Sequence, residues 1–268
     1  MSIAADFFDK YFEIVQAVSW AERDAAYALR YQVYCVENPF EDGSVHRCGR
    51  EQDEYDARAV HSLIRHRESG EFAACVRLVL PKQDDPETPF PIEAECGHAF
   101  YKDHRAVSVA LDRSRLSEIS RFAVSKRFKR RLNEASSPSG TSPEAVYQDA
   151  DSRSGAGQRG MPYITVGLFA AVIRTSVEHG MTDWYAVMEP GLLRLLSRFG
   201  IHFHPVGALV EHHGRRRPTA ARVADVIRGI HDERPDVWEI VSDRGRFPGL
   251  EENGPWLNER MENPGKLP

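Results

Sequence analysis

Apolar and polar positions recur along the N-terminal part of the chain in patterns that predict a strand followed by a helix. Residues 11–18, YFEIVQAV, carry the aromatic and β-branched side chains that are typical of strands. Ser19 and Glu22 then have the spacing of a capping box, in which each side chain binds a free backbone amide at a helix start. The sequence therefore predicts a first strand and then a helix over residues 21–37.

Further along, strand-like and helix-like stretches follow one another. An antiparallel hairpin is predicted over residues 59–66 and 71–81, with a turn around Gly70. In the second half, glycines that suit helix ends follow two apolar stretches. There the pattern predicts a buried helix, a strand, a helix, a strand and a basic stretch entering an amphipathic helix, over 161–180, 182–190, 191–200, 201–211 and 215–230.

A further strand is predicted over residues 116–124, LSEISRFAV, and it breaks its own alternation. Counted by parity, Leu116, Phe122 and Val124 fall on one side of the strand and Ile119 falls on the other. A strand that changes sides in this way often contains a β-bulge, and bulges gather near active sites. The sequence therefore predicts an irregular strand close to a functional site.

The order of the elements predicts a single domain over residues 1–268. A strand, a helix and a hairpin come first, and strands and helices alternate afterwards, which indicates an α/β fold. Residues 134–160 are rich in Ser, Gly, Pro and Asp and lack periodicity, so we expect a flexible insertion there. Residues 243–268 are expected to form an irregular C-terminal tail.

Composition and charge narrow the classes of protein. No apolar run approaches the length of a membrane helix, and the N-terminus lacks a secretion-signal pattern, so we expect a cytoplasmic protein without an integral membrane segment. The net charge of −5 argues against nucleic acid as a partner. His202 and His204 share a strand face, but no carboxylate or cysteine completes a metal site, so we expect no metal. The cysteines have no C-x-x-C spacing, which indicates free thiols at Cys35, Cys48, Cys75 and Cys96.

The informative residues are charges placed inside otherwise apolar segments. Arg77 lies in the middle of CVRLVLP, and Glu118 and Arg121 interrupt the strand over 116–124. Burying any of these charges alone is costly, so each one is expected to meet a partner or a ligand. A network of salt bridges that ties loops to the edge of a sheet explains them, and so does a catalytic cleft.

Four motifs occur in the order of a known motif series. ALRYQVY (28–34), EQDEYD (51–56), CVRLVLP (75–81) and EISRFAV (118–124) resemble those of the acyl-homoserine-lactone synthases. The chain is similar as well to the N-acyl amino acid synthases and, most closely, to the acyltransferases associated with PEP-CTERM and exosortase systems. These families are relatives of the acetyltransferase (GNAT) superfamily. The resemblance implies the GNAT fold, a mixed and mostly antiparallel sheet flanked by helices.

The same resemblance implies an N-acyltransferase. Its donor would be a fatty acyl group on acyl carrier protein, or on coenzyme A, with the thioester carried by phosphopantetheine. Its acceptor would be the amine of an amino acid or a related small amine. No permanently bound cofactor is implied, and the partners would be the acyl carrier protein and the small-molecule amine.

Residue roles follow from the resemblance. Glu118 matches the carboxylate proposed to take the proton from the attacking amine, and Arg121 matches its partner near the acyl donor. The donor's pantetheine arm would enter between diverging strands at 116–124 and 182–189. The acceptor side of the cleft, and the strand arginine that holds it in place, match Arg30, Tyr34, Asp53, Asp56 and Arg77.

Two departures from the family pattern bear on the substrates. The glycine-containing loop that holds coenzyme A pyrophosphate is missing after EISRFAV. The family's Trp after the first helix is missing too, with only Phe40 as a substitute, which favours an amino acid over S-adenosylmethionine as acceptor. In place of the loop stand five positive side chains that suit docking of acyl carrier protein or form a solvated basic edge: Lys126, Arg127, Lys129, Arg130 and Arg131.

Two alternatives therefore stay open beside the N-acyltransferase. One is an autoinducer synthase that uses S-adenosylmethionine as acceptor. The other is a non-catalytic module that binds acyl carriers. Glu118 sealed in a bidentate ion pair without a cavity would favour the binding module, whereas an open cleft beside it would favour catalysis.

Overall fold

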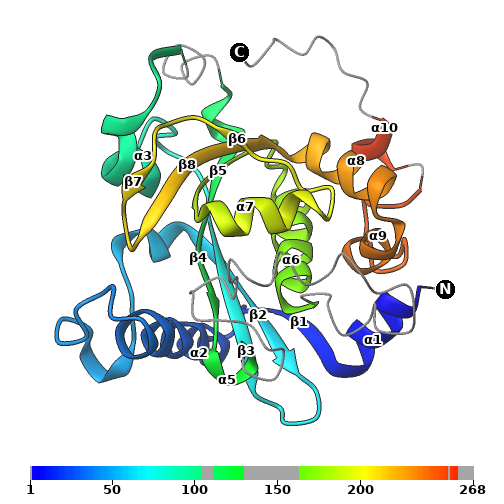
Figure 1. Ribbon diagram of the computed structural model, residues 1–268, viewed down its shortest axis with the longest axis horizontal. Coiled ribbons are helices and arrows are strands. Elements are labelled where there is room, and N and C mark those ends of the chain that lie inside the picture. Colours follow the sequence, from blue (N-terminus) through cyan, green and yellow to red (C-terminus); the bar gives the residue numbers. More distant parts are fainter. Residues whose placement is uncertain (1, 104–110, 130–162, 253, 259–268) are drawn as a thin grey trace.

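One open sheet of eight strands organises the fold (Figure 1). The computed structural model describes residues 2–103, 111–129, 163–252 and 254–258. The strand order is β1-β2-β3-β4-β5-β8-β6, with β7 paired to β8, and only the β4–β5 pair is parallel among the described strands. The strands are β1 Phe12–Gln16, β2 Ala59–His66, β3 Phe72–Val79, β4 Leu116–Val124, β5 Asp183–Met188, β6 His204–Pro205, β7 Val210–Glu211 and β8 Arg215–Arg222.

Helices cover both faces of the sheet. In Figure 1, α1, α6, α8 and α9 lie together at the right, where they share one hydrophobic core with the sheet, and α2 and α3 lie at the left on the other face. This mixed, mostly antiparallel α/β arrangement is the predicted fold class. The described helices are α1 Ile3–Tyr11, α2 Trp20–Tyr31, α3 Pro91–Cys96, α5 Lys126–Lys129, α6 Tyr163–His179, α7 Pro190–Ser197, α8 Val223–Glu233, α9 Pro235–Val241 and α10 Pro255–Asn258.

The predictions for the first part of the chain hold where local signals are strong. Ser19 and Glu22 form the capping box at the start of α2, and the helix continues as a π-helix over Gln32–Glu37. The hairpin of β2 and β3 turns at Gly70, whose φ of +71° is the left-handed conformation that suits glycine. Helix α1 was not predicted. Its apolar residues, Phe8 among them, find their partners only in the tertiary fold, where α1 packs against α9.

A bulge interrupts β4, as predicted. Arg77 of β3 pairs with Ser120 and Cys75 pairs with Ala123, so two residues of β4 oppose one residue of β3. Arg121, one of those two, has a φ of +49°, a conformation that costs a residue with a side chain about 1 kcal/mol or more. Stable contacts of the surrounding structure must therefore hold the bulge in place.

The bulge corrects one part of the prediction. Phe122 and Val124 belong to the same core as Ile119, whereas Leu116 packs on the opposite face with residues of α3. Parity counting had placed Leu116 with Phe122 and Val124. The extra residue in the bulge moves every later side chain to the other face, which parity counting without the bulge cannot include.

After Ile119, just before the bulge, β4 and β5 separate. Their parallel pairing runs from Leu116 and Asp183 to Ile119 and Ala186, and no register partner follows. Both strands continue past this point, so the sheet opens between them. The predicted divergence of these two strands is confirmed.

In the C-terminal part the amphipathic helix expected within 215–230 is present as α8, but the single strand expected over 201–211 is wrong and strand β8 was missed. The stretch over 201–211 forms only two short strands, β6 and β7, and residues 215–222 form the long strand β8 between β5 and β6. Arginines hide the strand signal of β8, yet Thr219 and Ala221 are buried in the sheet. The insertion over 134–160 lies outside the described residues. Within the expected tail the structure describes α10.

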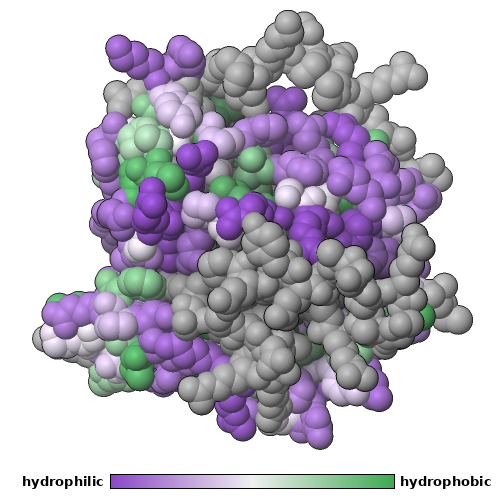
Figure 2. Space-filling view, viewed as in Figure 1, coloured by the Kyte–Doolittle hydropathy of each residue, from purple (hydrophilic) through white to green (hydrophobic). Residues whose placement is uncertain are grey.

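Membrane-spanning helices and metal-ligand clusters are both absent from the described part of the chain. No helix there is long and apolar enough to cross a bilayer. The face in Figure 2 is mainly hydrophilic, with hydrophobic side chains gathered in small areas. The described residues also contain no group of three side chains that could hold a metal ion.

Candidate active site

A cavity of about 510 Å³ lies where β4 and β5 separate. Its wall includes side chains of β3, β4 and β5, the start of α3, the acidic loop before β2, and the turn between β7 and β8. Six acidic residues line it, against three arginines, which makes the cavity favourable for a cation. These residues are Glu41, Asp53, Glu54, Glu95, Glu118, Glu189, Arg77, Arg121 and Arg216.

Glu118 lies on β4 just before the bulge and lines this cavity. Its side chain is only 3% exposed, and one carboxylate oxygen accepts a hydrogen bond of 2.8 Å from the backbone N–H of Ile92. Burial raises the pKa of Glu118 to about 8, although the Ile92 hydrogen bond opposes that shift. No ion pair joins Glu118 to another described residue. A carboxyl group in this state exchanges its proton near neutral pH.

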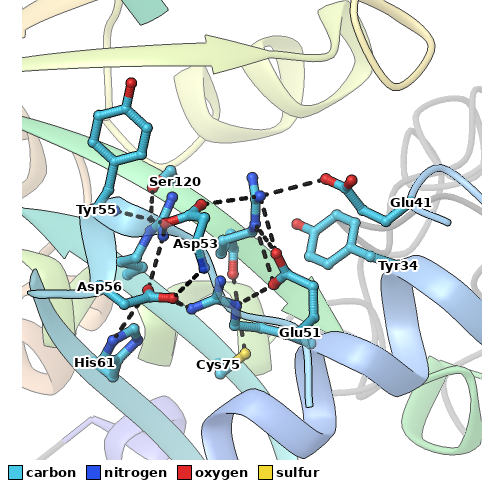
Figure 3. A network of polar contacts seen from close by, with 12 residues as sticks. Tyr34, Glu41, Glu51, Asp53, Tyr55, Asp56, His61, Cys75 and Ser120 are labelled. Carbon is cyan, nitrogen blue, oxygen red and sulfur yellow. Dashed lines mark hydrogen bonds and ion pairs between the residues drawn. The ribbon is translucent and has the colours of Figure 1, made fainter. Parts of the chain in front are cut away.

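Acidic side chains from the loop before β2 bind buried arginines. Arg30, from α2, forms ion pairs with Glu51 and, at 2.6 Å, with Asp56. Arg77, from β3, binds Asp53 at 2.5 Å and the same Asp56 at 2.8 Å. Figure 3 shows Glu51, Asp53 and Asp56 gathered around one centre. The structure thus brings together four of the five residues that sequence reasoning assigned to the acceptor side.

Arg121 extends this network from the bulge of β4. Its Nη2 atom lies 3.0 Å from Glu51, 3.2 Å from Asp53 and 3.4 Å from Glu41. The sequence had placed Arg121 as the partner of Glu118 near the acyl donor. In the structure its guanidinium group binds the acidic loop, and Arg121 also lines the cavity together with Glu118. Its role near the acyl donor stays a prediction.

The network stays charged over a wide pH range. Burial alone would raise the pKa of Glu51, but Arg30 and Arg121 outweigh it and lower that pKa to about 2. Asp56 responds in the same way, since Arg30 and Arg77 hold its pKa below the ordinary value despite burial. Glu51 and Asp56 are therefore ionised and paired at neutral pH.

Tyr34, the fifth residue of the predicted acceptor side, supports the bulge. Its hydroxyl donates a hydrogen bond of 3.2 Å to the backbone carbonyl of Phe122, and its ring lies 5.7 Å from the Arg121 guanidinium carbon. Burial raises the pKa of Tyr34 to about 12, so the hydroxyl keeps its proton. The π-helix brings Tyr34 to this position at the cavity wall.

Sequence reasoning missed several residues of the site. Glu51 is buried between two arginines, and its signal was present because it opens the quoted motif EQDEYD. Glu41 and His213 contact each other at 3.3 Å, and both line the cavity together with Arg216. No local pattern marks these three residues, which come together only in the fold.

The predicted docking cluster is only partly described. Lys126 is half-buried and its ammonium group donates to the backbone carbonyl of Glu37, so it is occupied by the end of the π-helix. Arg127 is 59% exposed and pairs with Glu71. The Lys129 side chain, together with Arg130 and Arg131, lies outside the described residues.

A family comparison decides what kind of domain this is. Residues 29–136 match the profile of the acetyltransferase (GNAT) domain. The chain carries a GNAT acyltransferase domain. The matched segment of this GNAT domain spans the C-terminal end of α2, the π-helix that follows it, the hairpin of β2 and β3, and β4 with Glu118. A search of curated proteins finds no match to the sequence.

Solved structures share the fold of the GNAT domain. TofI, crystallised with an inhibitor and MTA, aligns with a TM-score of 0.55 at 20% identity, over 83% of this chain and 98% of its own. BjaI, a CoA-dependent acyl-homoserine lactone synthase with SAM and isopentyl-CoA, aligns with a TM-score of 0.52 at 18% identity, over 91% of this chain and 94% of its own. At these identities the likeness concerns the fold.

Proposed function

We propose that this protein is an N-acyltransferase that moves a fatty acyl group from a phosphopantetheine thioester to the amine of an amino acid or a related small amine. The observation that carries the proposal is Glu118, a buried carboxyl group without an ion-pair partner among the described residues, at the cavity where β4 leaves β5. This arrangement matches the condition that favours catalysis over a binding module, because Glu118 faces an open cavity.

Glu118 would act as the general base. The amine must lose a proton in order to attack the thioester carbonyl, and ionised Glu118 accepts that proton directly or through a water molecule. As the C–N bond forms and the C–S bond breaks, the proton passes to the leaving thiolate, which departs as a thiol. With a pKa of about 8, Glu118 suits this exchange near neutral pH.

The bulged strand would stabilise the transition state. Beyond Ile119, β4 has no register partner on β5, so that edge of its backbone borders the cavity. We assign the oxyanion of the tetrahedral intermediate to backbone amides of this edge. The thioester arm would enter through the same opening.

The charge of the cavity supports an amine as acceptor. Its acidic residues outnumber its arginines two to one, which favours a ligand that arrives with a positive charge. Acyl carrier protein is the proposed donor, since Arg127, which is exposed although it pairs with Glu71, lies in α5 directly after β4; coenzyme A is its alternative. An association with PEP-CTERM and exosortase systems and a cytoplasmic location belong to the same proposal.

The test offers the purified protein acyl groups of several lengths on acyl carrier protein and on coenzyme A. Acceptors are a panel of amino acids and S-adenosylmethionine, and mass spectrometry detects the products. N-acyl amino acids are expected, both in this assay and in lipid extracts of cells that express the protein. An acyl-homoserine lactone product would select the autoinducer synthase instead. No acylated amine from any donor would refute the proposed activity.

A further inference from the structure

Arg216 lines the cavity with a guanidinium group that is only partly satisfied by the described residues. It lies on β8, next to β5 in the sheet, and its side chain is 13% exposed. Its Nε atom is buried and has no hydrogen-bond partner among the described residues. Its Nη2 atom forms an ion pair with Glu189 at 3.6 Å, a distance that is longer than a hydrogen bond. An orphaned buried donor is costly, so a ligand that accepts from it gains affinity.

The neighbour of Arg216 provides an internal comparison. Arg217 also has a buried Nε atom without a hydrogen-bond partner among the described residues, but it does not line the cavity. Successive residues of a strand point to opposite faces, which explains the difference. Of these two adjacent arginines, only Arg216 can meet a molecule inside the cavity.

The hairpin of β7 and β8 holds Arg216 in place. Its turn passes through His213, at a φ of +51°, and Gly214, at a φ of +92°. The His213 ring stacks on Phe40 with centroids 5.8 Å apart, and its Nε2 atom lies 3.3 Å from Glu41. The strand that carries Arg216 is therefore tied at the cavity wall to the loop that carries Glu41.

We propose that Arg216 binds the carboxylate of the acceptor. The acceptor would then be an α-amino acid, or another amine with an oxyanionic group, and a simple amine would bind far more weakly. This inference rests on the proposed function and adds the residue that determines acceptor specificity. A guanidinium group matches the two oxygens of a carboxylate, and a hydrogen bond to a charged group contributes more than a neutral one.

The phosphate of phosphopantetheine offers the same oxyanion chemistry from a second source. The acidic lining of the cavity opposes a doubly charged phosphate more than a zwitterion, whose ammonium group is attracted by those carboxylates. We therefore assign Arg216 to the acceptor. The two sources differ in which substrate loses affinity when the arginine is removed.

The experiment compares amino acids with their decarboxylated amines, for example tyrosine with tyramine and leucine with isopentylamine. In the Arg216→Met variant, the KM for the amino acid should rise about 10- to 100-fold, as expected for loss of a charge-assisted hydrogen bond. The KM for the matching amine and for the acyl donor should stay unchanged. Arg217→Met is the matched control and should leave all three values as in the wild type.

Calorimetric titration of each amino acid into the protein repeats the comparison without turnover. If Arg216→Met does not fold, Arg216→Lys takes its place in both measurements. The inference is overturned if the wild type acylates tyramine and tyrosine equally well and Arg216→Met has no effect on either. That result would leave the proposed function standing. A rise in the donor KM alone would assign Arg216 to the phosphate and overturn it too. If no amine is acylated, the proposed function fails, and the titration still decides whether Arg216 binds a carboxylate.

Discussion

At the scale of the residue, Glu118 combines burial with access to a cavity. Its charge is not neutralised by a partner in the described part of the chain, and its hydrogen bond comes from a backbone amide. Arg77 and Arg121, by contrast, are occupied by the acidic loop. This division leaves Glu118 at the cavity as a carboxyl group with a raised pKa, while the two arginines nearby are held in their ion pairs.

The first prediction concerns turnover. Glu118→Gln keeps the shape of the side chain but cannot accept a proton, so kcat should fall about 10²- to 10⁴-fold while KM changes little. Raising the pH should restore part of the rate, because more of the acceptor amine is then already neutral. Steady-state kinetics measure both effects. Glu68→Gln, in the exposed turn of the β2–β3 hairpin, is the control, and wild-type turnover in Glu118→Gln would end the case for this base.

The second prediction concerns stability and pH. The folded state holds the proton of Glu118 up to about pH 8, whereas an unfolded chain releases it near pH 4.5. The free energy of unfolding of the wild type should therefore fall as the pH rises from about 4.5 to 8. Glu118→Gln lacks this titrating group, so its free energy of unfolding should not show that fall. Urea unfolding of both proteins at pH 5 and pH 9 measures this. Parallel pH profiles for the two proteins would contradict the raised pKa.

At the scale of the element, the bulge of β4 connects the cavity to the ion-pair network. Arg121 occupies the left-handed region at the bulge, and its guanidinium group binds Glu51 and Asp53. Tyr34 binds the next carbonyl along β4. These contacts hold a backbone conformation that the strand would not otherwise adopt, and they separate β4 from β5 at the level of the cavity.

The third prediction tests this strained backbone. Replacing Arg121 removes its ion pairs in any variant, but Arg121→Gly also relieves the strain of a φ of +49°, whereas Arg121→Ala does not. The Gly variant should therefore be more stable than the Ala variant by about 1 kcal/mol, the reverse of the usual order within a strand. Denaturant unfolding of the two variants gives the difference. A less stable Gly variant would show that the bulge is not strained.

At the scale of the whole molecule, the sheet opens on the side where the acyl donor has to arrive. The opening between β4 and β5 leads to the cavity, and β4 continues into α5 with its basic side chains. A macromolecular donor would therefore have to dock near α5 in order to deliver its thioester.

The fourth prediction tests that docking. Reversing the charge of Arg127, Arg130 and Arg131 should weaken turnover with acyl carrier protein but not with coenzyme A, and the loss should grow as the salt concentration falls. Rates measured across ionic strengths with both donors decide it. Arg246→Glu, at an exposed arginine of the C-terminal part, controls for general charge effects. If the charge-reversed variant matches the wild type with acyl carrier protein at every salt concentration, these arginines do not form a docking surface.

The sequence by itself determined the elements whose signals are local. The capping box of Ser19 and Glu22 begins α2, Gly70 turns the hairpin, and the broken alternation of 116–124 marks the bulge, because each signal lies within a few consecutive residues. The charges inside apolar segments are also local signals, and they identified most residues of the ion-pair network. A buried charge needs a partner wherever that partner comes from.

Only the tertiary structure decided the rest. Glu51 became central because Arg30 and Arg121 meet it from opposite sides, and α1 formed because α9 covers its apolar face. Strand β8 and the position of Arg216 depend on pairing with β5, about thirty residues away along the chain. These features arise from contacts between residues far apart in sequence, and the free energy of such contacts is not encoded in any local pattern.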